Sequence, residues 1–275
     1  MLASFLIFFR EAFEASMICS IMLAYLVKIG KKDRFKDVWI GIWAAVVVAA
    51  IGGLVVFSTL RNYAGSTLQT EIEGITYFVA CGVLTYMTFW MKRQGQNLKE
   101  DLHAKMDAAI TVGSMFAVAF IAFITVGREG LETVVFMIAI AFQTNPWMMA
   151  LGAGMGIIAG LMLSYVIYVM GKRIKLKHFF DTMGTLLMLF GAGLLANGIE
   201  AFQELGWLPG QRALWSTAFI LKEDSTFGDI MHSFFGYADG PTALQVVVYL
   251  GFLVVVLWLF WRKGSRNEQQ SLSTN

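Results

Sequence analysis

The chain has 275 residues, of which 57% are apolar and only 15% are charged. A soluble domain carries about a quarter charged residues, so this composition excludes an ordinary water-soluble globular protein. The net charge of +2 by itself identifies no partner, and we expect no nucleic-acid partner. The first residues are not expected to form a cleaved signal peptide, because they lack a basic region and Arg10 interrupts the apolar stretch.

Seven apolar runs follow one another along the chain, each long enough to cross most of a hydrocarbon core of about 30 Å. Backbone groups in lipid must be satisfied within the segment, so each run is predicted to be a helix. The fold class is therefore all-α, a polytopic membrane protein with seven transmembrane helices and the lipid bilayer as its surroundings. The runs cover 2–28, 38–60, 72–92, 113–142, 147–171, 179–204 and 243–261.

The basic residues between these runs predict the orientation. Sixteen of the 21 Lys and Arg residues fall on one side of the membrane, three fall on the other, and Arg10 and Arg128 lie within runs. The side rich in Lys and Arg is the cytoplasmic one, which predicts the N-terminus outside and the C-terminus inside. The chain is then a multi-pass protein of the plasma membrane, most simply a bacterial inner membrane.

One charged motif occurs twice, as Arg10-Glu11-Ala12-Phe13-Glu14 and again as Arg128-Glu129-Gly130-Leu131-Glu132, 118 residues apart. It divides residues 1–262, a single transmembrane domain, into one repeat at 1–93 and another at 113–205. Because each repeat has three helices, an odd number, the second repeat is inverted in the membrane relative to the first. Such repeats place a substrate site at their interface near the midplane of the bilayer. An outer loop at 206–241, a seventh helix at 243–261 and a cytoplasmic tail at 263–275 lie outside the repeats.

Each motif places its charges on one helical face. Glu11 and Glu14 are separated by three positions, and Arg10 and Glu14 by four, so an ion pair can form along the helix. A charge at the bilayer centre costs about 2.5–3.5 kcal/mol, so six would cost roughly 15–20 kcal/mol if unrelieved. That exceeds the typical stability of about 5–15 kcal/mol. These side chains must face inward and be paired, or meet water or an ion.

If the two faces meet, four carboxylates and two guanidiniums leave a formal charge of −2, which a multivalent cation would balance. Ligands that are all oxygen favour hard ions. The absence of His and Cys from both motifs argues against zinc and copper(I) and fits Fe(III), Mn or Ca. Salt bridges used only for assembly, or a proton relay, are the alternatives. The three histidines elsewhere are expected in loops, as ordinary surface residues.

Other residues have expected roles around this site. Acids at the outer helix ends are candidates for a funnel that concentrates cations: Glu71, Glu73, Glu200 and Glu204. Asp181 near the inner start of the sixth run is a candidate for assisting release, or else an N-cap residue. Gly152, Gly156 and Gly160, four apart, predict a close helix contact.

The twin R-E-x-x-E motifs, in the first and fourth of seven helices, resemble those of the oxidase-dependent iron permeases. That family includes the fungal high-affinity iron permease and its bacterial counterpart EfeU. The resemblance covers essentially the whole chain and implies iron uptake across the plasma membrane, with iron as transported substrate and no bound organic cofactor. By matching position, it implies Glu11, Glu14, Glu129 and Glu132 as iron ligands, with Arg10 and Arg128 as their partners.

The resemblance also implies separate partner proteins that oxidise iron, producing Fe(III) from Fe(II), and that bind it outside the membrane. We expect a permease with no catalytic residues. A transporter for another divalent metal, or a proton-coupled cation transporter, is the nearest alternative. An intramembrane di-iron oxidase is less favoured, because such carboxylate sites usually include E-x-x-H motifs, and neither motif here has the His.

Overall fold

The computed structural model describes residues 1–61, 67–94, 98–111, 115–170, 176–210, 212–222 and 225–273. Within these ranges the regular elements are helices, and the one β interaction is an isolated bridge between Ala213 and Thr242. The predicted all-α class is therefore confirmed.

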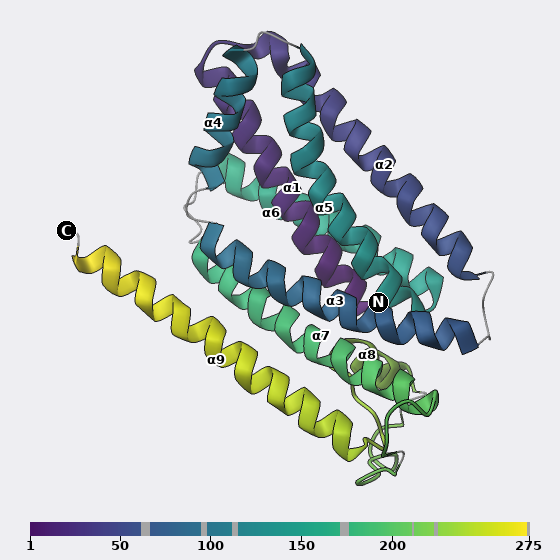
Figure 1. The fold of residues 1–275 in the computed structure, drawn as a ribbon. Coiled ribbons are helices and arrows are strands. Elements are labelled where there is room, and N and C mark those ends of the chain that lie inside the picture. The colour runs from purple at the N-terminus through teal and green to yellow at the C-terminus, as the bar shows by residue number, and fades with distance from the viewer. Residues whose placement is uncertain are drawn as a thin grey trace. The chain divides into compact units, whose positions relative to one another are not determined.

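Seven long helices coincide with the seven apolar runs (Figure 1). They are α1 (Leu2–Lys28), α2 (Phe35–Arg61), α3 (Thr67–Gln94), α5 (Met115–Gln143), α6 (Pro146–Met170), α7 (Leu176–Glu204) and α9 (Ala243–Ser273). A 3-10 turn, η1 (Lys32–Arg34), and two shorter helices, α4 (Leu98–Thr111) and α8 (Thr226–Phe235), lie between the runs. The last helix continues beyond the predicted end at residue 261. The histidines were wrongly expected in loops, because His103, His178 and His232 all lie on helices.

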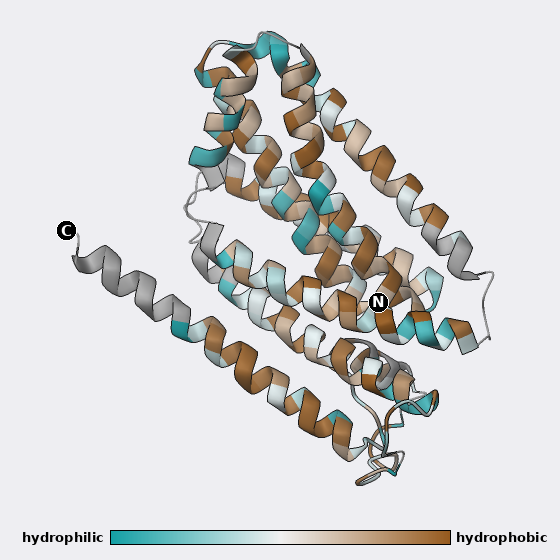
Figure 2. Cartoon of the chain, viewed as in Figure 1, coloured by the Kyte–Doolittle hydropathy of each residue, from teal (hydrophilic) through white to brown (hydrophobic). Residues whose placement is uncertain are grey.

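Five stretches of the described residues are long and apolar enough to cross a membrane, judged by length and composition. They are Lys32–Val55, Thr67–Lys92, Pro146–Ile167, Asp181–Glu204 and Ala243–Arg262. The other two long helices, α1 and α5, carry three charged residues each in their middle. Figure 2 shows these charges as hydrophilic colour half-way along two otherwise apolar helices. Seven crossings therefore remain a prediction, with five supported by composition.

The chain divides into two compact units, and neither follows the boundaries of the predicted repeats. The first unit comprises Met1–Ala64 and Gln94–Leu176, which contain α1, α2, α4, α5 and α6. The second comprises Gly65–Arg93 and Lys177–Asn275, which contain α3, α7, α8 and α9. Each unit thus takes helices from both halves of the sequence.

In the first unit, α1 packs along α6 through the predicted glycine contact. A Cβ added to Gly156 would lie 2.5 Å from the carbonyl oxygen of Phe5 and 2.9 Å from the amide nitrogen of Phe9. A Cβ added to Gly160 would lie 2.6 Å from the carbonyl oxygen of Phe9. Since these neighbours are backbone atoms that cannot swing aside, the glycines are what allow the two helices to approach this closely.

The second long contact of this unit, between α2 and α5, is built in the same way. A Cβ on Gly41 would lie 2.8 Å from the Cβ of Ala122, and one on Gly130 would lie 2.8 Å from the Cβ of Ala49. Small residues therefore face each other along both helix pairs.

The two contacts use corresponding positions. A shift of 118 residues carries α1 onto α5, and a shift of 111 carries α2 onto α6. The contact of Ser4 on α1 with Gly152 on α6 then corresponds to the contact of Ala122 on α5 with Gly41 on α2. In the same way, the contact of Ala12 with Gly160 corresponds to the contact of Gly130 with Ala49. The helix pairs α1 with α6 and α5 with α2 therefore repeat one packing pattern, contact for contact.

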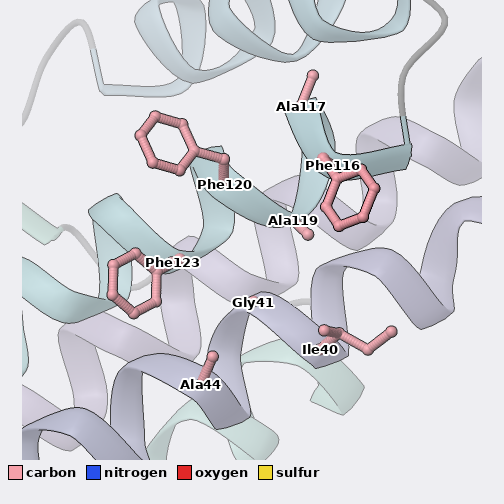
Figure 3. A pocket seen from close by; sticks show the side chains of 8 residues that line it. All are labelled: Ile40, Gly41, Ala44, Phe116, Ala117, Ala119, Phe120 and Phe123. Atoms are coloured by element: carbon pink, nitrogen blue, oxygen red, sulfur yellow. The ribbon is translucent and has the colours of Figure 1, made fainter.

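A shallow groove of about 400 Å³ lies on the surface between α2 and α5. Figure 3 shows the side chains that line it, all of them apolar: Ile40, Gly41, Ala44, Phe116, Ala117, Ala119, Phe120 and Phe123. With no polar atom from these side chains, the groove offers no ligand to a cation. The side chains of this unit that could bind a cation are therefore those of the charged motifs.

The glycine contact between α6 and α1 gives a matched pair of substitutions. Gly156→Ala should lower the free energy of unfolding by about 1–3 kcal/mol, the usual cost of overpacking. Gly154→Ala should be neutral or slightly stabilising, because a Cβ there meets nothing within 4 Å and alanine favours a helix. Thermal unfolding of both purified variants in detergent measures the difference. Equal midpoints would contradict the close contact.

Candidate functional site

The two charged motifs lie in the middle of α1 and α5, which contact each other within the first unit. The spacing of each motif puts its arginine and both glutamates on one side of the helix. The small residues on the packed sides, described above, fix which way the helices are turned. The motif faces are thereby directed to the space between α1 and α5.

The α1 motif is fully buried and internally paired. Arg10 donates from Nε to Glu14 Oε1 at 2.9 Å and from Nη1 to Glu11 Oε1 at 3.0 Å. The Arg10 side chain is only 4% exposed. The ion pair predicted between Arg10 and Glu14 from their four-residue spacing is confirmed. The contact of Arg10 with the adjacent Glu11 depends on the arginine rotamer and could not be predicted from spacing.

The α5 motif has the same principal pair in a more open setting. Arg128 donates from Nε to Glu132 Oε1 at 2.9 Å, with its side chain 35% exposed. Glu129 is buried. Two motifs with nearly the same sequence therefore differ in their access to the surroundings, and this difference was not predicted.

The two motifs meet. Each of Glu11, Glu14 and Glu129 offers a carboxylate oxygen, and these three atoms lie within 4.8 Å of one another. Arg10 also lies within electrostatic reach of Glu129 and Glu132, so the fourth glutamate borders the same site. Among the described residues this is the one place where three or more His, Cys, Asp or Glu side chains gather so closely.

The second oxygen of each motif glutamate has no hydrogen-bond donor among the described residues. These atoms are the buried Oε2 of Glu11, Glu14, Glu129 and Glu132. A buried acceptor left without a hydrogen-bond partner destabilises the folded protein by about 1–3 kcal/mol, and by more when it is charged. Four such oxygens together are unusual in a native structure. A cation bound to these oxygens would supply the missing partner for all four.

The donor set defines the ion that fits. Every ligand atom is a carboxylate oxygen, which suits hard cations rather than zinc or copper(I). The arginines occupy one oxygen of Glu14 and one of Glu132, and so hold those carboxylates in place while leaving the other oxygen available. Four carboxylates and two guanidiniums leave a formal charge of −2 for the cation to balance.

The four candidate outer acids lie in the second unit and do not belong to the one group of possible metal ligands found among the described residues. Glu73 accepts a hydrogen bond from Tyr77 at 2.5 Å and lies in electrostatic reach of Glu204 and His232. Glu200 accepts from Gln245 Nε2 at 3.1 Å. Glu204 is exposed and Glu71 is half-buried. Tyr77 and Gln245, which orient these acids, were not identified from the sequence.

Asp181 is not an N-cap, which corrects one of the two predicted roles. The helix α7 begins at Leu176, so Asp181 lies inside it. Its Oδ1 is 3.3 Å from Lys92 Nζ, which also donates to the carbonyl oxygen of Phe260 at 2.8 Å. Lys92 thus links α3, α7 and α9 within the second unit.

Comparison with known proteins agrees with this geometry. The family model described as the iron permease FTR1 family matches residues 1–263. The chain belongs to this family. It is therefore a permease of iron transport and a multi-pass membrane protein, and the resemblance seen in the twin motifs is confirmed.

Two curated relatives illustrate the match. The chain is 33% identical over 265 residues to a protein of Yersinia pestis named ferrous iron permease EfeU, an alignment that covers 95% of this chain and 93% of the relative. It is 32% identical over 264 residues to the protein of the same name from Escherichia coli O6:H1, with 94% and 95% covered. No solved structure matches the chain.

The unequal burial of the two arginines predicts unequal effects of removing them. Arg10→Ala leaves two buried carboxylates without their donor and should cost about 3–5 kcal/mol of unfolding free energy, as for a broken buried ion pair. Arg128→Ala should cost clearly less, because the Arg128 side chain is 35% exposed and its pair with Glu132 is less enclosed. Chemical unfolding of both variants in detergent tests this.

A double variant separates charge from packing. Adding Glu14→Gln to Arg10→Ala removes one of the stranded charges and should recover part of the lost stability. A double variant less stable than Arg10→Ala alone would mean that the ion pair is not what stabilises this part of α1.

Proposed function

We propose that this protein takes up iron across the plasma membrane, the bacterial inner membrane, through the site formed by the two motifs. Glu11, Glu14, Glu129 and Glu132 are the iron ligands, and Arg10 and Arg128 hold them. The observation that carries the proposal is a set of four buried carboxylate oxygens for which the described residues supply no hydrogen-bond donor, contributed by two helices that contact each other. A hard cation is the partner that such oxygens lack.

The transported form is Fe(III), produced from Fe(II) by a separate iron-oxidising protein and delivered with the help of an iron-binding protein. Carboxylate oxygen is a hard ligand, which favours Fe(III) over softer ions. The relatives from Yersinia pestis and Escherichia coli are named for ferrous iron, and an external oxidation step reconciles that name with a carboxylate site.

The site lies between two inverted repeats, with the N-terminus outside and the C-terminus inside. Support comes from the matching contacts of α1 with α6 and of α5 with α2, because one packing pattern used twice is what a repeated unit produces. Inverted repeats place substrate at their interface and alternate access by rocking one repeat against the other. The motif helices are then the first helix of each repeat.

Access from outside uses Glu71, Glu73, Glu200 and Glu204, whose charges raise the local cation concentration. Asp181 assists release inside, in competition with its pair to Lys92. The membrane potential favours inward movement by about 2.3 kcal/mol per charge per 100 mV. Uptake of a cation without a second coupled ion is therefore energetically possible.

Neutralising a ligand should abolish transport while leaving the protein in the membrane. We expect Glu14→Gln and Glu129→Gln each to lower radioactive iron uptake into whole cells at least by the roughly 10–100-fold typical of damaged metal sites. Glu100→Gln, on the exposed surface of α4, is the matched control and should transport normally. Normal uptake by both motif variants, at equal membrane abundance, would rule out the assigned site.

Purified protein in liposomes then separates the alternatives. Uptake competed equally by Mn(II) or Ca(II) would indicate a general metal transporter, and uptake that collapses with the proton gradient would indicate proton coupling. Oxygen consumption on addition of Fe(II) would indicate an oxidase.

The access role of Glu73 predicts a kinetic effect of a different kind. Glu73→Gln should raise KM for iron uptake and leave the maximal rate nearly unchanged, because steering affects capture rather than passage. The effect should shrink as ionic strength rises. Initial rates over a range of iron concentrations, at low and high salt, measure it. An unchanged KM at low salt would remove Glu73 from the access path.

A further inference from the structure

A long connection joins α7 to α9 (Figure 1), and large apolar side chains are exposed on it outside the candidate membrane spans. Phe219 and Ile220, here called the apolar tip, are 84% and 74% exposed. Three further exposed residues of the same connection are Trp207, Leu214 and Trp215. Side chains of this size are rarely left in water as a group, so this surface has an occupant.

The tip is held in this exposed position by its own hydrogen bonds. The amides of Ile220 and Leu221 both donate to the carbonyl oxygen of Thr217, at 2.9 and 3.1 Å. Thr217 in turn donates from its amide to Asp239 at 2.7 Å, and Tyr237 Oη donates to Leu221 at 2.9 Å. The turn is therefore a built feature that presents Phe219 and Ile220 outward.

The base of the connection lies at the membrane boundary of this unit. One candidate span ends at Glu204, where the connection begins, and the next begins at Ala243, where it ends. Thr242, directly before that span, bridges to Ala213. Thr217 bonds to Asp239, four residues before α9 begins at Ala243, so its amide lies no more than about 17 Å from the start of α9. The tip is two residues further on.

The composition of residues 205–222 indicates what covers the apolar tip. Residues 205–222 are rich in Trp, Phe and Leu, while their two basic residues, Arg212 and Lys222, are balanced by Glu223 and Asp224 directly after them. Trp residues are typical of segments that lie in the membrane interface, where their rings enter the headgroup region. A protein partner is the other possible occupant, and nothing in the segment's charge favours it over lipid.

We propose that the apolar tip inserts into the interfacial region of the bilayer beside α9, with phospholipid as its partner. The contact reaches α7 through the base of the connection. Gln203 on α7 donates from Nε2 to the carbonyl oxygens of Pro209 and Gly210, at 2.9 and 3.1 Å. Insertion of the tip therefore holds the end of α7 that carries Glu200 and Glu204 at a fixed depth.

Site-directed spin labelling of the full chain tests this in nanodiscs that contain phosphatidylglycerol. In a background with Cys19→Ala and Cys81→Ala that retains iron uptake, nitroxide labels are placed at Phe219→Cys and Ile220→Cys. Val254→Cys, exposed on the apolar part of α9, serves as the bilayer reference. Lys105→Cys, exposed on the polar helix α4, serves as the aqueous reference.

Insertion predicts a ratio of oxygen to nickel-chelate collision rates several-fold higher at both tip positions than at Lys105→Cys, approaching that at Val254→Cys. A ratio equal to that of Lys105→Cys would place the tip in water and overturn the proposal. Low accessibility to both reagents would mean that protein covers the tip, which also overturns it. Retained uptake by the labelled variants shows that they are folded.

Discussion

Buried carboxylates inside apolar helices are the constraint on which the rest of this structure depends. Each motif glutamate would be too costly in such surroundings without a donor, and Arg10 is the donor that α1 supplies to both of its own. The arginine reaches only one oxygen of each. What remains is a set of oxygens that no described side chain satisfies, and the proposed cation site rests on these oxygens.

The unequal burial of the two motifs would give the proposed cation site a direction. Arg10 is enclosed and engages two glutamates, whereas Arg128 is partly open and engages Glu132. A cation arriving with some of its water would meet the open pair more easily, and would lose that water on reaching the enclosed one. A fully symmetric site would offer no such gradient. The asymmetry comes from what surrounds each motif, since the motif sequences are nearly the same.

The sequence predicted the features that depend on local spacing. Long apolar runs predicted the long helices, and the four-residue spacing predicted the pair between Arg10 and Glu14. It could not predict α4 and α8, because short helices with mixed composition lack a periodic apolar signal. Nor could it predict the contact of Arg10 with Glu11 or of Asp181 with Lys92, which depend on rotamers and on helices distant in sequence. That the motif faces meet was a conditional expectation until the helix contacts were known.

The packing behind the motifs shows what their spacer residues do. At the level of the glutamates, each helix pair combines one glycine with one alanine, but the roles are exchanged. Ala12 on the motif helix faces Gly160 on α6, whereas Gly130 on the other motif helix faces Ala49 on α2. The constraint therefore acts on the sum of the two side chains, because the distance between helix axes depends on both. This explains why the two motifs keep Arg and Glu in common but differ at the first of the two positions between the glutamates, Ala12 and Gly130.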